Sequence, residues 1–226
     1  MLRKIYPSGA LQILPVEKGL VFIADQGNKE DKKIVSYKHF DIATNKISLV
    51  TRKVYLLNKF GNEFEYFAEK ITDYINCRVL VTGKFHFIIY PDGVIFKISR
   101  DKDSTTSKKL TLNGLGPADA VLDGDCIWCS YPESGCIIKY NSDNLTETLR
   151  IGNENSAKKG ILTSPYGLFI EGRTMTVTSS EISEILYIDL DILCVKEHKE
   201  VSESVLTYAK IEEREIALTK SGIYII

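Results

Sequence analysis

The stretch that decides the fold is Cys126-Ile127-Trp128-Cys129-Ser130, then Tyr131-Pro132-Glu133-Ser134-Gly135, then Cys136-Ile137-Ile138-Lys139-Tyr140. Two runs of apolar and β-branched residues flank a short segment that contains proline and glycine. This is the pattern of a β-hairpin, because proline and glycine supply the backbone angles that a tight turn needs. The stretch therefore predicts two antiparallel strands joined by a turn.

The same hairpin pattern returns along the chain, before and after this copy. The other copies are residues 21–25 with 34–37, 85–90 with 94–98, 175–178 with 185–189, and 215–219 with 223–226. A further strand precedes each hairpin, and a more polar strand follows most of them. The preceding strands are predicted at 10–16, 77–82, 118–122, 166–170 and 205–211, and the following strands at 46–51, 108–112, 145–151 and 195–199. Four strands per repeat, at a mean spacing of about 45 residues, indicate an all-β fold, a five-bladed β-propeller.

The two ends of the chain complete this pattern. The last repeat has three strands when the sequence stops, and residues 2–6 precede the first repeat without belonging to it. We expect the N-terminal strand to pair with residues 223–226 and so to close the last blade and the ring. Closure would leave no exposed seam between the first and last blades. The sequence thus predicts a single propeller domain over 1–226.

One long gap separates the first two hairpins. Apolar residues in 62–75 recur at helical spacing, which predicts a short helix there. Phe64, Tyr66 and Ala68 also alternate, so a strand fits the same segment. Residues 53–76 would alternatively supply a sixth, thin blade. The mixed-sign segment 29–33 in the first hairpin is interpreted as a solvated loop.

The composition narrows the class of protein. The chain has 29 lysine and arginine residues against 30 aspartate and glutamate residues, with no basic run, which argues against a nucleic-acid partner. No stretch approaches the ~20 apolar residues of a membrane-spanning helix, and the N-terminus does not resemble a signal peptide. Five cysteines without an export signal favour reduced thiols and a cytoplasmic location. The oligomeric state is left open.

Residues 116–130 and 137–141 resemble a blade of the NHL, regucalcin/gluconolactonase and virginiamycin-lyase type of propeller. Residues 164–172 are similar to the start of another blade. The resemblance implies the fold, and it raises two kinds of chemistry known in these families. One is a divalent metal held by acidic and asparagine side chains in the channel, and the other is a general-base histidine. No residue set in this chain matches the metal ligands, and none of His39, His86 and His198 follows a Gly-Pro blade start.

Other chemistry-bearing residues have structural explanations. Cys126 and Cys129 form a lone C-x-x-C, but residues three apart on a strand point to opposite faces, so we expect buried structural thiols and no metal site. Cys129 and Cys136 are expected to be cross-strand neighbours. His86 is expected to be a packed or surface strand residue rather than a catalytic base, and Trp128 is expected to pack between blades. The sequence leaves catalytic residues unknown and implies no cofactor.

Propeller geometry still selects a candidate face. The inner strands begin at the same end of the blades to which the turns between second and third strands point, and this is the channel mouth. The candidate ligand-binding residues there are Asn76, Tyr90, Asp92, Asp119, Tyr131, Glu133, Tyr166 and Glu181. Aromatic, acidic and amide groups suit a small polar ligand or a peptide or protein partner. The competing interpretation is that these are ordinary exposed turn residues.

Two functions follow from these observations, and the sequence does not decide whether the protein is an enzyme. The first is a non-catalytic ligand-binding or protein-binding propeller that uses the channel-mouth loops. The alternative is a metal-dependent lactone hydrolase or lyase of the gluconolactonase/virginiamycin-lyase type, which would use a divalent metal. A third hypothesis is a structural subunit with an apolar patch over residues 64–75.

Overall fold

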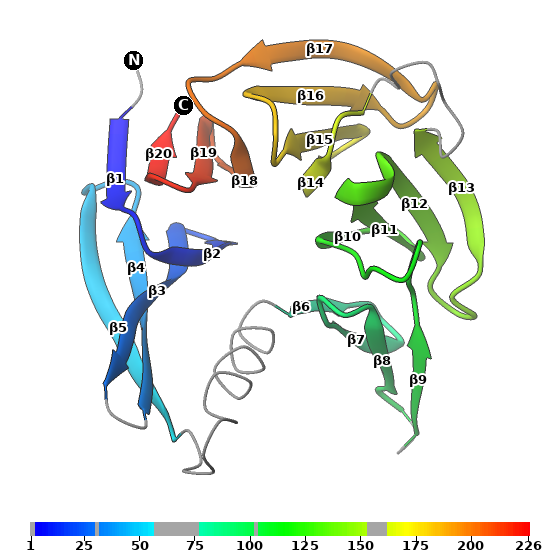
Figure 1. Cartoon of the computed structure of the whole chain (residues 1–226), viewed down its shortest axis with the longest axis horizontal. Helices are drawn as coiled ribbons and strands as arrows, with labels where there is room; N and C mark the ends of the chain where they lie inside the picture. Colours follow the sequence, from blue (N-terminus) through cyan, green and yellow to red (C-terminus); the bar gives the residue numbers. More distant parts are fainter. Residues whose placement is uncertain (1–2, 30–31, 57–76, 102–103, 153–161) are drawn as a thin grey trace. The chain divides into compact units, whose positions relative to one another are not determined.

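The structure is a computed structural model of the chain, and it describes residues 3–29, 32–56, 77–101, 104–152 and 162–226. Its strands form five four-stranded antiparallel sheets, which are the blades of a five-bladed β-propeller (Figure 1). The predicted all-β fold class is therefore confirmed. The helix predicted over 62–75 lies outside the described residues, as does most of the 53–76 segment considered for a sixth blade. No helix in the described part of the chain is long and apolar enough to cross a membrane.

The described residues separate into two compact units. The first unit comprises Met1–Asn76 with Thr207–Ile226 and contains two sheets, in the strand orders β2-β3-β4-β5 and β1-β20-β19-β18. Their bounds are β1 (Arg3–Pro7), β2 (Ala10–Val16), β3 (Gly19–Lys29), β4 (Lys32–Asp41), β5 (Lys46–Leu56), β18 (Val205–Ile211), β19 (Arg214–Thr219) and β20 (Gly222–Ile225). β18 begins two residues before the division between the units.

The N-terminal strand occupies the place that the sequence predicts for it. β1 pairs antiparallel with β20, with Arg3 opposite Ile225 and Lys4 opposite Tyr224. Figure 1 shows β1 in blue beside β20 in red. The last blade is thus completed by the first strand of the chain.

The first hairpin is longer than the sequence predicts. A solvated loop is expected at 29–33, but β3 runs to Lys29 and β4 starts at Lys32. Lys33 is buried, and its ammonium lies 2.6 Å from the carboxylate of Asp25 on the neighbouring strand. This cross-strand ion pair lets charged residues continue the ladder, so the loop prediction is wrong at these positions.

The core of the first unit lies between its two sheets. Leu20, Phe22 and Phe40 from the β2–β5 sheet pack with Ile216 and Ile223 from the other sheet. Tyr6 packs its ring against Phe22, with centroids 4.7 Å apart. Burial of these side chains stabilises the pairing of the two blades through the hydrophobic effect.

The second unit, Cys77–Leu206, contains three sheets. The strands of the first are β6 (Arg78–Val81), β7 (Phe85–Ile89), β8 (Val94–Ser99) and β9 (Thr105–Lys109). The second has β10 (Asp119–Asp123), β11 (Cys126–Tyr131), β12 (Cys136–Asn141) and β13 (Glu147–Gly152), with the short 3₁₀ helix η2 (Pro132–Ser134) between β11 and β12. The third has β14 (Pro165–Glu171), β15 (Thr174–Ser179), β16 (Glu184–Asp189) and β17 (Cys194–Glu200).

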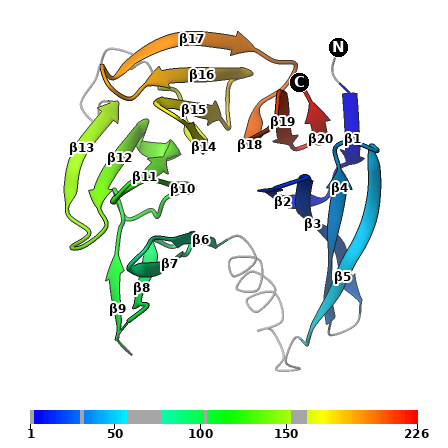
Figure 2. The same cartoon turned by 180° about the vertical axis from the view of Figure 1, so that it is seen from behind.

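The strand register in this unit fixes where the candidate residues lie. The first residue of each inner strand faces the last or next-to-last residue of the following strand, as Asp119 faces Ser130 and Pro165 faces Ser179. The starts of the inner strands and the turns at 90–93, 131–135 and 180–183 therefore share one end of their sheets. We call this end the turn face. Figure 2 shows the same three sheets from behind.

Candidate functional site

Asp119 begins β10 and ties three successive blades together. Its carboxylate lies 2.5 Å from the Arg78 guanidinium, which belongs to the first strand of the preceding blade. The other carboxylate oxygen accepts a hydrogen bond of 2.9 Å from the backbone N–H of Leu168, in the first strand of the following blade. Asp119 is 4% exposed. Both of its oxygens are thus engaged by the protein.

Tyr166 and Ser130 join two of these blades beside Asp119. The Ser130 hydroxyl donates to the backbone carbonyl of Tyr166 and accepts a 3.1 Å hydrogen bond from the N–H of Asp119. The Tyr166 side chain is half-buried. The structure therefore brings Asp119 and Tyr166 together, through one serine hydroxyl.

Tyr131 lies in the core of its blade. It is 2% exposed, and its hydroxyl is 2.9 Å from the hydroxyl of Tyr140. Burial raises the pKa of Tyr131, and it raises the pKa of Tyr140 to about 12. The Tyr131 hydroxyl is therefore occupied inside the blade and does not face solvent at the turn face.

Tyr90 and Asp92 shape the turn between β7 and β8. The Tyr90 ring meets Phe96 edge-on, with centroids 6.0 Å apart. Asp92 is exposed, and its carboxylate accepts a 3.0 Å hydrogen bond from the N–H of Val94. Such a bond from an aspartate to the backbone two residues ahead fixes a turn.

The connection from this blade to the next packs tightly on that turn. The backbone N–H of Leu110 donates to the carbonyl of Gly93 at 2.8 Å. Gly116 approaches so closely that an added Cβ would lie 2.2 Å from the Pro91 carbonyl oxygen. The position of Asp92 is thus set by backbone contacts across the blade boundary.

Glu133 lies in η2, between β11 and β12, and its side chain is exposed. The helix is held from outside by Asn113, whose side-chain amide donates a 3.2 Å hydrogen bond to the Ser134 hydroxyl. Gly135 ends η2 in the left-handed region at φ 60°. Within the described residues, the Glu133 carboxylate makes no hydrogen bond or ion pair.

Glu181 lies in the turn between β15 and β16, and its side chain is exposed. Ser179 orders this turn: its hydroxyl accepts the N–H of Glu181 at 3.2 Å and donates to the carbonyl of Thr163 at 2.8 Å. The Glu181 carboxylate makes no ion pair with the described part of the chain. Asp92, Glu133 and Glu181 are therefore three exposed carboxylates at equivalent turns of three successive blades.

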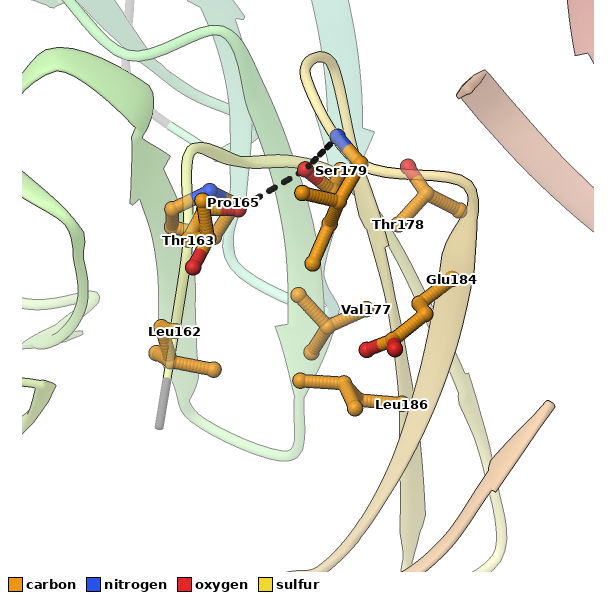
Figure 3. A pocket seen from close by; sticks show the side chains of 9 residues that line it. Leu162, Thr163, Pro165, Val177, Thr178, Ser179, Glu184 and Leu186 are labelled. Carbon is orange, nitrogen blue, oxygen red and sulfur yellow. Dashed lines mark hydrogen bonds between the residues drawn. The ribbon is translucent and has the colours of Figure 1, made fainter. Parts of the chain in front are cut away.

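A small recess opens beside the Glu181 turn. Its cavity volume is about 10 Å³, which is about the room of one water molecule. Its lining combines apolar side chains with hydroxyls and one carboxylate: Leu162, Thr163, Pro165, Val177, Thr178, Ser179, Ile182, Glu184 and Leu186. Figure 3 shows the Glu184 carboxylate pointing toward Val177 and Leu186.

Glu184 is the residue that sequence reasoning missed. It is half-buried, and within the described residues its carboxylate has no cationic partner. The signal in the sequence is its spacing from Leu186, because residues two apart on a strand share a face. An acidic residue on the apolar face of a strand places a carboxylate beside apolar surface.

The opposite end of these sheets carries a different kind of cluster. Asp123 accepts hydrogen bonds from the indole N–H of Trp128 at 3.2 Å and from Lys139 at 2.9 Å, and Arg173 lies 3.1 Å away. Burial disfavours the Asp123 carboxylate, but these hydrogen bonds and the two cations outweigh it and lower its pKa. Both carboxylate oxygens of Asp123 are thus engaged by neighbouring side chains, and Trp128 is 1% exposed. We interpret this cluster as a structural network.

The cysteines and Asn76 complete the set of predicted residues. Asn76 lies outside the described residues. Cys129 and Cys136 are buried and Cys126 is half-buried, and none of the three forms a disulfide. Cys136 faces Tyr131 rather than Cys129 across the hairpin, so the two thiols are diagonal neighbours. Among the described residues, no group of three or more His, Cys, Asp or Glu side chains is arranged to hold a metal ion.

Comparison with known proteins identifies the fold. No protein-family model matches the chain, and no curated protein matches its sequence. The Myxococcus xanthus glutaminyl cyclase structure is 10% identical, with a TM-score of 0.56 over 99% of this chain and 94% of that one. The computationally designed Ika8 protein is 8% identical, with a TM-score of 0.54 over 96% of this chain and 82% of that one. At such identities, the likeness concerns the propeller fold alone.

Proposed function

We propose that this chain is a non-catalytic binding module whose turn face recognises a cationic segment of a peptide or protein partner. The observation that carries the proposal is the Glu184 carboxylate, which points into an apolar recess without a described cationic partner. A carboxylate beside apolar surface suits a lysine side chain, because the alkyl stem can lie along the apolar surface while the carboxylate binds the ammonium.

The neighbouring turns extend the same preference. Glu181 lies beside the recess, and Asp92 and Glu133 occupy the equivalent turns of the two preceding blades. Exposed charges of one sign raise the local concentration of oppositely charged partners. The recess has a cavity volume of about 10 Å³, so it is a shallow contact point for the partner's side chain and not a site for a drug-sized ligand.

The family resemblance fits this proposal as a likeness of scaffold. Residues 116–141 resemble a blade of the NHL and gluconolactonase type, but Asp119, the acidic residue at that blade's start, has both oxygens bound by the protein itself. In our proposal it orders the turn face and does not contact the ligand. A cytoplasmic location goes with the same proposal, because none of the five cysteines forms a disulfide.

The test uses two labelled probes, one a short peptide of alternating lysine and serine and the other of alternating glutamate and serine. We expect fluorescence anisotropy to show binding of the lysine peptide that weakens as salt rises. The double variant E181Q/E184Q should bind it about tenfold more weakly. The matched control is E197Q, which removes an exposed carboxylate from β17, away from the recess.

Equal binding of both probes, or equal binding by E181Q/E184Q and the native chain, would contradict the proposal. A thermal-shift screen with Ca²⁺, Mg²⁺ and Zn²⁺, followed by a lactone-hydrolysis assay, examines the alternative function on the same samples. Metal-dependent turnover would favour a hydrolase or lyase over a binding module.

A further inference from the structure

β5 is the outer strand of its sheet in the first unit, and it differs from the other outer strands. It is eleven residues long, and within the described residues β4 is its hydrogen-bonded neighbour. Figure 1 shows β5 in cyan at the edge of this sheet. A strand in this position presents backbone N–H and C=O groups on its outer side, where a further strand can pair.

Large apolar side chains are exposed along this strand. The exposed fractions are 40% for Ile47, 56% for Leu49, 57% for Val50 and 51% for Val54. Among the described residues of the other outer strands, β1, β9, β13 and β17, no large apolar side chain reaches that exposure. Among the described residues, highly exposed large apolar side chains on an outer strand are therefore specific to this blade.

Most of these side chains share one face of the sheet. Residues two apart on β4 lie on the same face. On β5, Val50 is an extra residue in a bulge, so Leu49 and Arg52 lie on the same face although they are three positions apart. The facing pairs on that face are Ile47 with Phe40, Leu49 with Lys38, Arg52 with Ser36 and Val54 with Ile34. Phe40 belongs to the core between the two sheets, so the apolar row of β5 continues that core outward.

All charged residues of β5 are basic. Lys46, Arg52 and Lys53 are exposed, and the strand has no acidic residue. None of the three cations pairs with a carboxylate of the described chain. Arg52 lies on the apolar face, between Leu49 and Val54.

We propose that β5 accepts an extended acidic and apolar segment of a partner protein as an added strand. The backbone of the segment would pair with the free edge, its apolar side chains would extend the row of Leu49 and Val54, and a carboxylate would lie opposite Arg52. This is recognition by strand addition, in which the main chain supplies affinity and alternate side chains supply specificity. Charge favours this occupant over a second copy of β5, which would bring three more cations to the same edge.

The experiment uses fluorescence anisotropy to measure binding of a labelled peptide in which valine, glutamate and valine occupy alternate positions, with serine between them. These three side chains share one face of the added strand, as Leu49, Arg52 and Val54 do on β5. A second peptide has the same sequence with alternate backbone nitrogens methylated, which removes the N–H donors that strand pairing needs. We expect the first peptide to bind and the methylated one to lose binding. R52E should weaken binding about tenfold, whereas K109E, which changes an exposed lysine on the outer strand β9, should not.

Several results would overturn the proposal. Failure of the unmethylated peptide to bind would do so, as would equal binding of both peptides or equal effects of R52E and K109E. Sedimentation that shows a dimer abolished by R52E, without peptide binding, would identify a second copy as the occupant instead. The turn-face variants change residues of the other unit, and the turn face is proposed to bind cationic rather than acidic peptides. The turn-face proposal and the β5 proposal can therefore fail separately.

Discussion

The Arg78 guanidinium and the Asp119 carboxylate form an ion pair at 2.5 Å that joins the first strands of two successive blades. The two side chains are 17% and 5% exposed, so neither charge is well hydrated. The same carboxylate accepts the Leu168 N–H from the next blade. One side chain thus sets the relative position of three inner strands in the Cys77–Leu206 unit.

Replacing Asp119 with asparagine should destabilise the protein by about 3–5 kcal/mol, because it removes the carboxylate that neutralises the largely buried Arg78 guanidinium. Urea unfolding followed by circular dichroism measures this loss. The control is D143N, which removes an exposed pair with Lys84 at 3.8 Å and should change stability by less than about 1 kcal/mol. Similar losses in both variants would refute the role given to Asp119.

Gly116→Ala should destabilise the protein by about 1–3 kcal/mol, since the new Cβ would overlap the Pro91 carbonyl and the Gly93 nitrogen. Gly83→Ala is the matched control, because a Cβ at Gly83 meets nothing within 4 Å. Thermal unfolding of both variants makes the comparison. A neutral G116A would mean that the 110–118 connection does not pack on the turn at 90–93.

The Asp123 network should make stability depend on acid pH. The pKa of Asp123 is lowered in the folded protein. The stability that the Asp123 carboxylate contributes is therefore fully present above the unfolded pKa of about 4, and it is lost as the pH falls through the lower pKa of the folded state. D123N should cost about 1–3 kcal/mol at neutral pH. The gap between native and D123N stabilities should narrow as the pH falls below about 4. A gap that stays constant over that range would contradict the assignment.

The hydroxyl pair of Tyr131 and Tyr140 should limit stability at the alkaline end. Both pKa values are raised by burial, that of Tyr140 to about 12. Their contribution is fully present below the unfolded pKa of about 10 and is lost as the pH rises through the folded values. Absorbance at the phenolate band should therefore show two tyrosines that ionise together with unfolding. Y131F should remove one of them from this group.

The strands were largely predictable because apolar alternation and turn residues specify hairpins locally. Ala10–Val16 matches β2, and the deciding hairpin matches β11 and β12 to within one residue. The pairing of β1 with β20 followed from counting strands per blade. The extension of β3 and β4 was not predictable from periodicity, because it depends on the ion pair between Lys33 and Asp25.

The placement of the candidate residues at one end of their sheets was predictable from the order of the strands, whereas the contacts of each side chain were not. The register confirms that the inner-strand starts and the turns share one end of each sheet in the Cys77–Leu206 unit. Some of the predicted side chains are buried rather than exposed, because their burial depends on residues distant in the sequence. Tyr131 continues the inward alternation of Ile127 and Cys129 and finds Tyr140 as its partner. Asp119 is occupied by residues 41 and 49 positions away, which no local pattern reveals.

The pairing of β1 with β20 also has a consequence for how the protein is made. The ribosome produces the outer strand of this blade first and its three inner strands last, so β1 must wait for partners while the other blades assemble. The entropy lost in joining such distant segments grows only with the logarithm of their separation, so the final ladder remains favourable. This blade is therefore expected to be the last to gain protection from hydrogen exchange during refolding.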